Sequence, residues 1–536
     1  MKAELPNNWA EVPLRDILLR TQNTNPATDR EGTIRYIDID AVDNNIQEVS
    51  NPKVLECGSV PSRARKEIEC GDVIFSLVRP YLKNLAIIPP ELHHEIASTA
   101  FYVCRLAGGV KSEWLYQHLR RDSVIQNLPT IGSSPPATRD VDFENHLVPL
   151  ASEAEQTRTL AILEPALAKI DEAQESLERV RKNLERYRAS VLKAACEGRL
   201  VPNEADLARR EGRDYEPASK LLSRILVARR KAWETSQLEA YQKKGKIPPK
   251  DWKSRYLEPK APDTSDLPGL PEGWCWATID QLCSRITSGS RDWSPYYGTG
   301  PGVFVMAQNV RMGRFDLWST QLVNPPKDNR DRDRSLIQKD DLLVTIVGAK
   351  TGDVCRVDVE LEEHFVCQSV ALLRPVRACA AKYMEAFLCS ESGGQAHFRK
   401  FTYGQGRPHL GFDQLQAVIV PLPPAREQEV IIEKIEEIVS SLSKVQGTAV
   451  NELERCHTLR QSLLKHAFSG KLVPQDPRDE PAAVLLERIR AQRKEQAAAV
   501  KALTSRAMKT PAARANRPAA ARRKRSPGTD VGRANG

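Results

Sequence analysis

The sequence predicts an α+β protein made of two copies of one unit, in which a globular domain is followed by a long helix. Two observations lead to this fold class. Residues 130–202 align with residues 402–474 without a gap, at a constant offset of 272. Nearer the front, Trp9 matches Trp274 at an offset of 265, so the second copy is seven residues longer between these anchors. Self-similarity at a fixed offset indicates a repeated structural unit.

The two copies agree most closely in short blocks that frame the predicted helix. These blocks are Gly132 and Gly404, Pro136 and Pro408, Val148-Pro149-Leu150 and Val420-Pro421-Leu422, Glu155-Gln156 and Glu427-Gln428, and Gly198 and Gly470. The length difference falls inside the globular part. We therefore expect the shared function on the helices and the divergent function on the domains.

Each globular part contains β-branched apolar runs followed by helix-like segments. Strands are expected at 71–75 and 100–106 in the first copy and at 341–345 and 366–373 in the second, with helices at 113–128 and 382–401. A Gly-rich loop then leads to the Val-Pro-Leu block in both copies. This order of elements predicts an α+β domain.

After each Val-Pro-Leu block, apolar residues recur at heptad spacing, which is typical of a coiled coil. The expected seam is Leu163, Ile170, Leu177, Leu184 and Val191 in the first copy, and Ile435, Ile438, Leu442, Val445, Leu459 and Leu463 in the second. Ser152 and Glu155 fit a capping box, and Pro165 is expected to kink or restart the helix. About thirty helical residues rise roughly 45 Å, enough for a spacer. Core packing or dimerisation is the alternative reading.

The chain divides into six expected segments. They are a globular domain (1–148), a repeated helix (149–202), a charged helical segment with a Pro-rich linker (203–262), a second globular domain (263–420), a second repeated helix with a following helix (421–504), and a disordered basic tail (505–536). The tail is too poor in apolar residues to fold.

Composition limits the class of protein. The 536 residues carry a net charge of +9, which favours a polyanionic partner only modestly. The 11 cysteines form no C-x-x-C pair, so neither structural zinc nor a disulfide framework is expected. There is no signal-like start and no long apolar run, and these observations favour the cytoplasm.

The sequence shows no convincing catalytic or metal-binding motif. Asn324-Pro325-Pro326 imitates a methyltransferase loop, but Lys327 stands where an aromatic ring would stack on a flipped base. The segment from Gly348 to Thr351 lacks the earlier glycine of a phosphate loop, and no H-E-x-x-H pattern occurs. We expect no catalytic residue and no bound metal.

Loops with forked donors and cations are the best candidates for reading DNA, because base edges and phosphates need those groups. The candidates are Arg79, Lys83, Ser133, Ser134, Thr138 and Arg139 in the first copy, and Ser290, Arg291, Lys327, Arg330, Arg332, Lys350, Thr351, Gln405, Arg407 and His409 in the second. Any one of them could equally be a solvated surface residue. As sets they favour DNA binding.

The duplicated pattern resembles the specificity subunit of type I restriction-modification enzymes, over nearly the whole chain outside the basic tail. The residues that carry the resemblance are Leu270-Pro271-Glu272-Gly273-Trp274, Pro421-Leu422-Pro423-Pro424 with Glu427-Gln428, and Ser462-Leu463-Leu464-Lys465 running to Gly470-Lys471-Leu472. The first copy departs from the pattern at Asn7-Asn8 and at Ala151-Ser152.

The resemblance implies two target-recognition domains separated by two long helices, packed as an antiparallel coiled coil with pseudo-two-fold symmetry. It implies a non-catalytic subunit that recognises a bipartite site on double-stranded DNA. Adenine methylation would come from two copies of a methylase subunit binding S-adenosylmethionine, and ATP- and Mg²⁺-dependent translocation and cleavage from a restriction subunit. This chain would bind none of these cofactors. The alternatives are a tandem-domain coiled-coil adaptor or structural protein, and a self-contained methyltransferase or nuclease.

Overall fold

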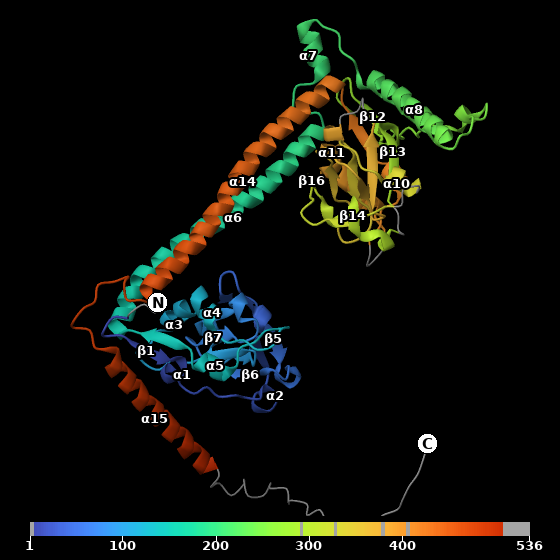
Figure 1. The fold of residues 1–536 in the computed structure, drawn as a ribbon. Helices are drawn as coiled ribbons and strands as arrows, with labels where there is room; N and C mark the ends of the chain where they lie inside the picture. The colour runs from blue at the N-terminus through green and yellow to red at the C-terminus, as the bar shows by residue number, and fades with distance from the viewer. Residues whose placement is uncertain (1–4, 290–292, 326–329, 377–380, 404–407, 508–536) are drawn as a thin grey trace, which may run out of the picture. The chain divides into compact units, whose positions relative to one another are not determined.

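The computed structural model describes residues 5–289, 293–325, 330–376, 381–403 and 408–507 (Figure 1). The chain forms two compact units. The first unit contains residues 1–175 and 452–536, and the second contains residues 176–451. Each unit therefore holds one globular domain together with parts of both long helices.

The first domain opens and closes on one two-stranded sheet. β1 (Ala10–Pro13) pairs antiparallel with β11 (Leu147–Leu150), and Ala10 lies opposite Leu150. Between these strands lie a sheet of order β10-β7-β8 and a sheet of order β5-β2-β9-β6. Their strands are β2 (Thr33–Ile37), β5 (Lys53–Glu56), β6 (Ala64–Glu67), β7 (Val73–Ser76), β8 (Leu85–Ile87), β9 (Ile96–Ser98) and β10 (Phe101–Cys104).

The second domain repeats this plan. β12 (Cys275–Thr278) pairs antiparallel with β22 (Ile419–Leu422), and Cys275 lies opposite Leu422. Two larger sheets have the orders β13-β21-β18-β19 and β17-β14-β20. Their strands are β13 (Cys283–Ser288), β14 (Tyr297–Val305), β17 (Gln321–Val323), β18 (Leu342–Thr345), β19 (Val354–Arg356), β20 (His364–Val366) and β21 (Val370–Pro375).

The helices of both domains are shorter than the sequence predicts. The expected helix at 113–128 is divided into α3 (Ser112–Leu119) and α4 (Asp122–Asn127), because Arg121 adopts an extended conformation between them. The expected helix at 382–401 is divided into α11 (Ala381–Cys389) and α12 (Gly394–Phe401). The remaining α-helices of the two domains are α1 (Leu14–Ile17), α2 (Pro26–Asp29), α5 (Asp140–Glu144), α9 (Ile279–Leu282), α10 (Arg330–Ser335) and α13 (Phe412–Gln416).

The two long helices are α6 (Glu153–Cys196) and α14 (Ala425–Ala467). In the first unit, the start of α6 shares a buried cluster with the end of α14, through Leu163 and Leu464. In the second unit, the end of α6 shares a cluster with the start of α14, through Ala195 and Ile431. This is antiparallel pairing. Ser152 caps α6, since its Oγ accepts the N–H of Glu155 at 3.1 Å.

Two details of the predicted helices need correction. The side chains of Val445 and Leu459 are 47% and 48% exposed, although both were assigned to the seam. A pair of helices buries only one narrow stripe of each, so the second apolar column faces outward. Of the two expectations for Pro165, a kink or a restart, the restart is wrong, because α6 continues through this residue.

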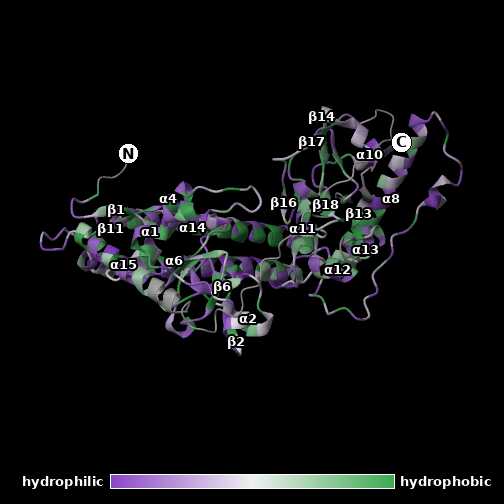
Figure 2. Ribbon diagram, turned by 90° about the horizontal axis from the view of Figure 1, so that it is seen from below, coloured by the Kyte–Doolittle hydropathy of each residue, from purple (hydrophilic) through white to green (hydrophobic). Residues whose placement is uncertain are grey.

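The repeat extends further along the chain than the alignment indicates. α8 (Ala218–Lys243) and α15 (Ala482–Ala507) both begin at an alanine that follows Glu-Pro, and hydrophobic and hydrophilic residues are mixed along both helices (Figure 2). An arginine binds the leading glutamate in both, Arg224 to Glu216 and Arg488 to Glu480. The extra helix α7 (Glu204–Glu211) of the first copy changes the offset and hides this match.

Each domain is completed by helices that follow the other copy in the chain. Leu221 and Ile225 of α8 belong to the core of the second unit, whereas Leu485 and Ile489 of α15 belong to the core of the first. The N–H of Ala218 bonds the carbonyl of Gly273 at 2.8 Å. Because each of these helices packs against the domain of the other copy, the order of motifs in the sequence does not reveal which domain it completes.

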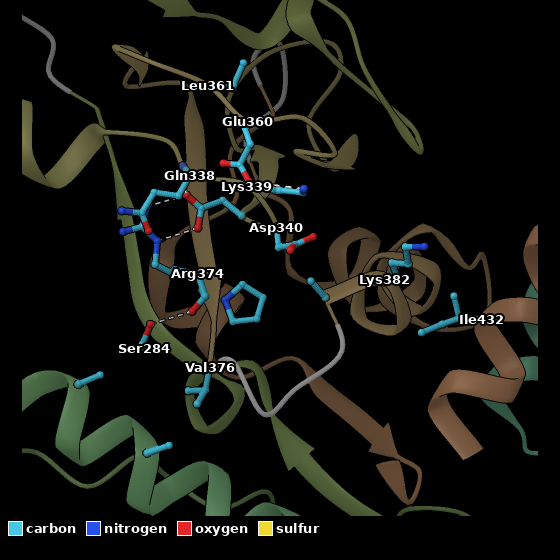
Figure 3. Close-up of a pocket in the computed structure, with 15 residues that line it drawn as sticks. Ser284, Gln338, Lys339, Asp340, Glu360, Leu361, Arg374, Val376, Lys382 and Ile432 are labelled. Carbon is cyan, nitrogen blue, oxygen red and sulfur yellow. Dashed lines mark hydrogen bonds and ion pairs between the residues drawn. The ribbon is translucent and has the colours of Figure 1, made fainter. Parts of the chain in front are cut away.

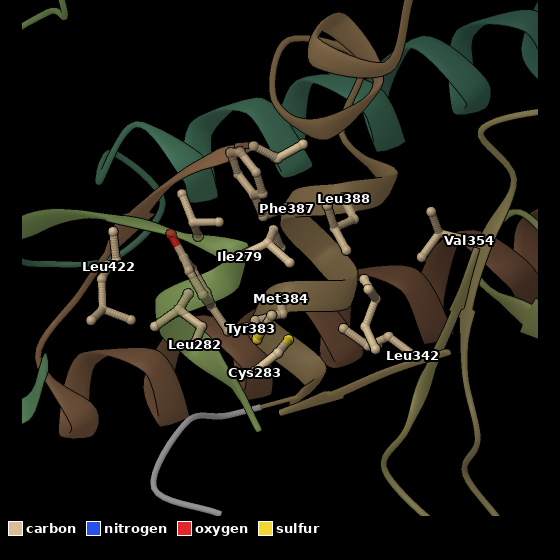
Figure 4. Close-up of a cluster of buried hydrophobic side chains, with 14 of the residues drawn as sticks. Ile279, Leu282, Cys283, Leu342, Val354, Tyr383, Met384, Phe387, Leu388 and Leu422 are labelled. Atoms are coloured by element: carbon tan, nitrogen blue, oxygen red, sulfur yellow. The ribbon is translucent and has the colours of Figure 1, made fainter. Parts of the chain in front are cut away.

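The core of the second unit shows how the helices and sheets meet (Figure 4). Ile279 and Leu282 of α9 lie in one buried cluster with Met384 of α11. Tyr383 donates its hydroxyl to the carbonyl of Pro421 at 2.7 Å, and in the first domain the indole of Trp114 donates to the equivalent carbonyl of Pro149 at 2.9 Å. A tyrosine and a tryptophan thus make the equivalent hydrogen bond in the two domains. No described helix is long and apolar enough to cross a membrane.

Candidate nucleic-acid interface

In the first domain, a short hairpin loop is attached to the turn that follows β7. The backbone groups of Ile131 and Ala137 exchange two hydrogen bonds, at 2.7 and 2.9 Å, and close the loop. The N–H of Arg79 bonds the carbonyl of Pro136 at 2.8 Å, and the N–H of Thr138 bonds the carbonyl of Leu77 at 2.9 Å. We call residues 131–137 the first reading loop.

The second domain builds the same loop with the same bonds. The backbone groups of Tyr403 and His409 exchange hydrogen bonds of 3.1 and 2.9 Å. The N–H of Gly348 bonds the carbonyl of Pro408 at 3.1 Å, and the N–H of Leu410 bonds the carbonyl of Ile346 at 2.9 Å. We call residues 403–409 the second reading loop, of which 404–407 lie outside the described residues.

The backbone hydrogen bonds that close the two reading loops are shared, but the side chains at the closing positions are not. Ile131 is replaced by Tyr403, and these side chains are 54% and 55% exposed. Ala137 is replaced by His409, whose ring lies 5.1 Å from that of Tyr403. A fixed frame that presents different side chains is what sequence recognition requires, because position comes from the frame and specificity from the side chains.

A buried ion pair holds the strand that supports each loop. Arg105 contacts Asp72 at 2.8 Å next to β7, and Arg374 contacts Asp341 at 2.7 Å next to β18. Both carboxylates are almost fully buried. Burial raises the pKa of Asp341, and its hydrogen bond and charge pairing with Arg374 act in the opposite direction. The sequence analysis missed these pairs, although their common offset of 269 could have shown them.

The turn after β7 contains unusual backbone. Arg79 and Lys83 flank a short 3-10 turn with φ values of +52° and +51°. Residues other than glycine rarely adopt this left-handed region, and such residues cluster at functional sites. The position equivalent to Arg79 is Gly348, with φ +112°. The backbone conformation of Arg79 is therefore unfavourable for an arginine. The fold does not require an arginine there, since the same turn of the second copy has a glycine.

The candidate residues of the first domain fall into two groups. Arg79, Ser133 and Ser134 are exposed on the turn and the first reading loop. Lys83 pairs with Asp122, and Arg139 pairs with Asp142 at 2.6 Å. The remaining candidate, Thr138, is only 4% exposed, and its hydroxyl has no hydrogen-bond partner among the described residues.

In the second domain, Lys350 is exposed on the turn after β18. Thr351 donates its hydroxyl to the carbonyls of Gly348 and Pro408, at 2.7 and 3.1 Å, and so ties this turn to the second reading loop. Arg332 pairs with Glu363. Ser290, Arg291, Lys327, Gln405 and Arg407 lie outside the described residues, and only the backbone of Arg330, in α10, is described.

A cavity of about 1040 Å³ lies at the opposite end of β18 from the second reading loop (Figure 3). Its wall includes the Asp341–Arg374 pair, Ser284, whose hydroxyl bonds the carbonyl of Arg374 at 3.1 Å, and Ala228 of α8. A smaller cavity of about 370 Å³, lined in part by His409 and Phe412, adjoins the second reading loop. The described residues contain no group of three or more His, Cys, Asp or Glu placed to hold a metal ion.

Comparison with known proteins identifies several relatives of this chain. The family model described as type I restriction modification DNA specificity domain matches residues 326–455. The type I restriction enzyme EcoBI specificity subunit of Escherichia coli is 24% identical over 361 residues, which are 66% of this chain and 65% of that protein. The chain is thus similar to the specificity subunits of type I restriction enzymes. The matched part spans slightly less than two thirds of this relative.

Two further comparisons extend the likeness to this family. The EcoDI specificity subunit of Escherichia coli is 22% identical over 406 residues, covering 72% of this chain and 77% of that protein. A solved chain described as the structural basis of complex assembly and conformational transition of the type I R-M system has a TM-score of 0.57 and 24% identity. It covers 87% of this chain and 99% of its own length. At this identity the likeness shows that the two chains share a fold.

Proposed function

We propose that the chain reads DNA sequence at two half-sites, one with each domain, and performs no catalysis of its own. The observation that carries this proposal is the pair of reading loops. Identical backbone bonds hold both loops, and different exposed side chains occupy them. Two unlike readers in one chain are suited to an asymmetric target divided by an unread spacer, as two-headed DNA readers fix half-site spacing by their geometry.

The parts common to both copies would bind the partner proteins. We propose that two copies of a methylase subunit dock on the long helices and on the duplicated helices that complete each domain. A restriction subunit would join this complex. S-adenosylmethionine, ATP and Mg²⁺ would then be bound by the partners, and the assembly would act in the cytoplasm. Support for this proposal comes from the duplication and from the names of the relatives, which are subunits of restriction enzymes.

Reconstitution with the methylase subunit encoded beside this gene tests the proposal. We expect methylated adenines in a bipartite motif with a constant spacer. The chain alone and the methylase alone serve as controls and should not methylate that motif. A continuous motif, or no methylation by the complex, contradicts the proposal.

Exchange of one domain sharpens this experiment. Replacing residues 1–148 by the corresponding part of another specificity subunit should change one half-site and leave the other unchanged. An adaptor without DNA recognition would show no salt-sensitive, sequence-dependent DNA binding in the same samples.

A further inference from the structure

One half of α6 is much more basic than its duplicated counterpart. Residues 179–193, which lie in the second unit, contain six basic residues and one acidic residue. The equivalent residues of α14, 451–465, contain three basic and two acidic residues. Since the fold and the seam are shared, neither requires the additional charge.

Four of these cations lie on one face of the helix. They are Arg179, Lys182, Arg186 and Lys193, and we call them the basic stripe. At 100° per residue they fall within roughly 60° of arc, nearly opposite the seam. All four side chains are exposed, and in the described part of the chain no carboxylate lies within ion-pair distance of any of them. Their counterparts on α14 are Asn451, Glu454, Thr458 and Lys465.

Helix electrostatics does not account for this charge. The helix dipole favours cations only in the last turn. Because α6 ends at Cys196, Lys193 alone of the four lies in the last turn, and Arg179 lies nearly four turns before it. Salt bridges along the helix do not account for it either, since the ion pair between Arg181 and Glu178, at 3.0 Å, involves no residue of the stripe.

We propose that the basic stripe binds phosphates of the DNA duplex without reading its sequence. The stripe is about 21 Å long, and a duplex presents one charge per ~1.7 Å of its axis, so four cations can meet several phosphates at once. Docking of identical methylase copies is a duplicated function and would need the charge on both helices. The basic stripe is present on α6 and not on α14, and this fits a DNA duplex that the two helices contact unequally.

This inference rests on the proposed function, and salt dependence of DNA binding tests it separately. The test variant of the full chain carries Arg179→Gln, Lys182→Gln, Arg186→Gln and Lys193→Gln. The matched control carries Lys244→Gln, Lys246→Gln, Lys250→Gln and Lys260→Gln, which remove the same charge from exposed positions of the linker that follows α8. Binding is measured for the mapped target and for unrelated duplex DNA, with the chain alone and with the methylase.

The test variant should lose on the order of tenfold or more in affinity for both DNAs, with the ratio between them unchanged. The slope of log affinity against log salt should become shallower by up to ~3.6, or about 0.9 per phosphate. The inference is overturned if the salt slope of the test variant is unchanged, or if the control variant changes equally. It is also overturned if the test variant loses methylase binding but keeps DNA binding, which would indicate an acidic protein partner. If the wild-type complex shows no preference for the target, the proposed function fails. The salt slope of the test variant still shows whether the basic stripe binds phosphates.

Discussion

Trp274 donates its indole N–H to a carboxylate oxygen of Glu427 at 3.0 Å, and this bond joins the start of the second domain to the start of α14. The equivalent residues of the first copy, Trp9 and Glu155, do not form it. The indole N–H of Trp9 has no partner among the described residues, and Glu155 accepts from Asn8 and Gln475 instead. Both tryptophans are 8% exposed. The two copies thus contain the same pair in two bonding states.

This difference predicts unequal effects of one substitution. Trp274→Phe removes a hydrogen bond to a buried carboxylate, which costs about 1.5–3 kcal/mol in addition to lost packing. Trp9→Phe loses the packing alone. We expect urea unfolding, followed by a probe in each unit, to show the larger destabilisation for Trp274→Phe. Equal losses in the two variants would contradict the bonding difference.

The glycines after the two long helices should tolerate alanine poorly. Gly198 and Gly470 both have φ +66°, and an added Cβ would meet Pro271 at 2.5 Å and Pro6 at 2.2 Å. Gly212 has φ +62° with nothing within 4 Å, and so Gly212→Ala is a matched control. The control should lose about 1–2 kcal/mol from its left-handed backbone.

Gly198→Ala and Gly470→Ala should lose more than this control, because each helix end is packed against the domain of the other copy. Thermal unfolding measures all three variants. A loss no larger than that of Gly212→Ala would show that these contacts relax without cost.

A buried histidine pair predicts acid sensitivity of the first unit. The Nε2 atoms of His118 and His146 lie 2.9 Å apart. Burial lowers the pKa of both, that of His146 from 6.5 to about 4. Because the folded pKa is depressed, the stabilisation is present above pH 6.5 and is lost as the pH falls toward 4.

His146→Gln should therefore reduce the loss of unfolding free energy between pH 7 and pH 4.5, by roughly 1–2 kcal/mol after allowance for partial exposure. Urea unfolding at several pH values measures this change. His93→Gln, at an exposed position, is the control and should follow the wild type. Parallel pH profiles for His146→Gln and the wild type would contradict the prediction.

The exposed residues of the reading loops should affect recognition and not stability. Tyr403→Ala should weaken methylation through the second half-site at least tenfold, since one base contact contributes about 1–3 kcal/mol. Ile131→Ala should act on the first half-site alone. Methylation of target libraries randomised in one half-site at a time measures both effects. A change in both half-sites, or a large loss of stability, would indicate a structural role.

Sequence reasoning identified the duplication and the strands at β7, β10, β18 and β21, because both depend on local patterns of residues. It placed Pro136 and Pro408 in loops that the structure attaches to the turns after β7 and β18. It missed the ion pairs of Asp72 and Asp341 because their partners lie 33 residues away in sequence. It also assigned Val445 to the seam, because heptad spacing does not reveal how wide a stripe the partner helix covers.

The sequence by itself determined the two-copy plan and the long helices, since offsets and periodicities are properties of the chain order. Only the tertiary structure decided that Leu221 of α8 completes the second domain and Leu485 of α15 the first. It also decided that Arg79 and Pro136 meet. Contacts between distant segments depend on which apolar faces can be buried together, and the order of residues does not state that choice.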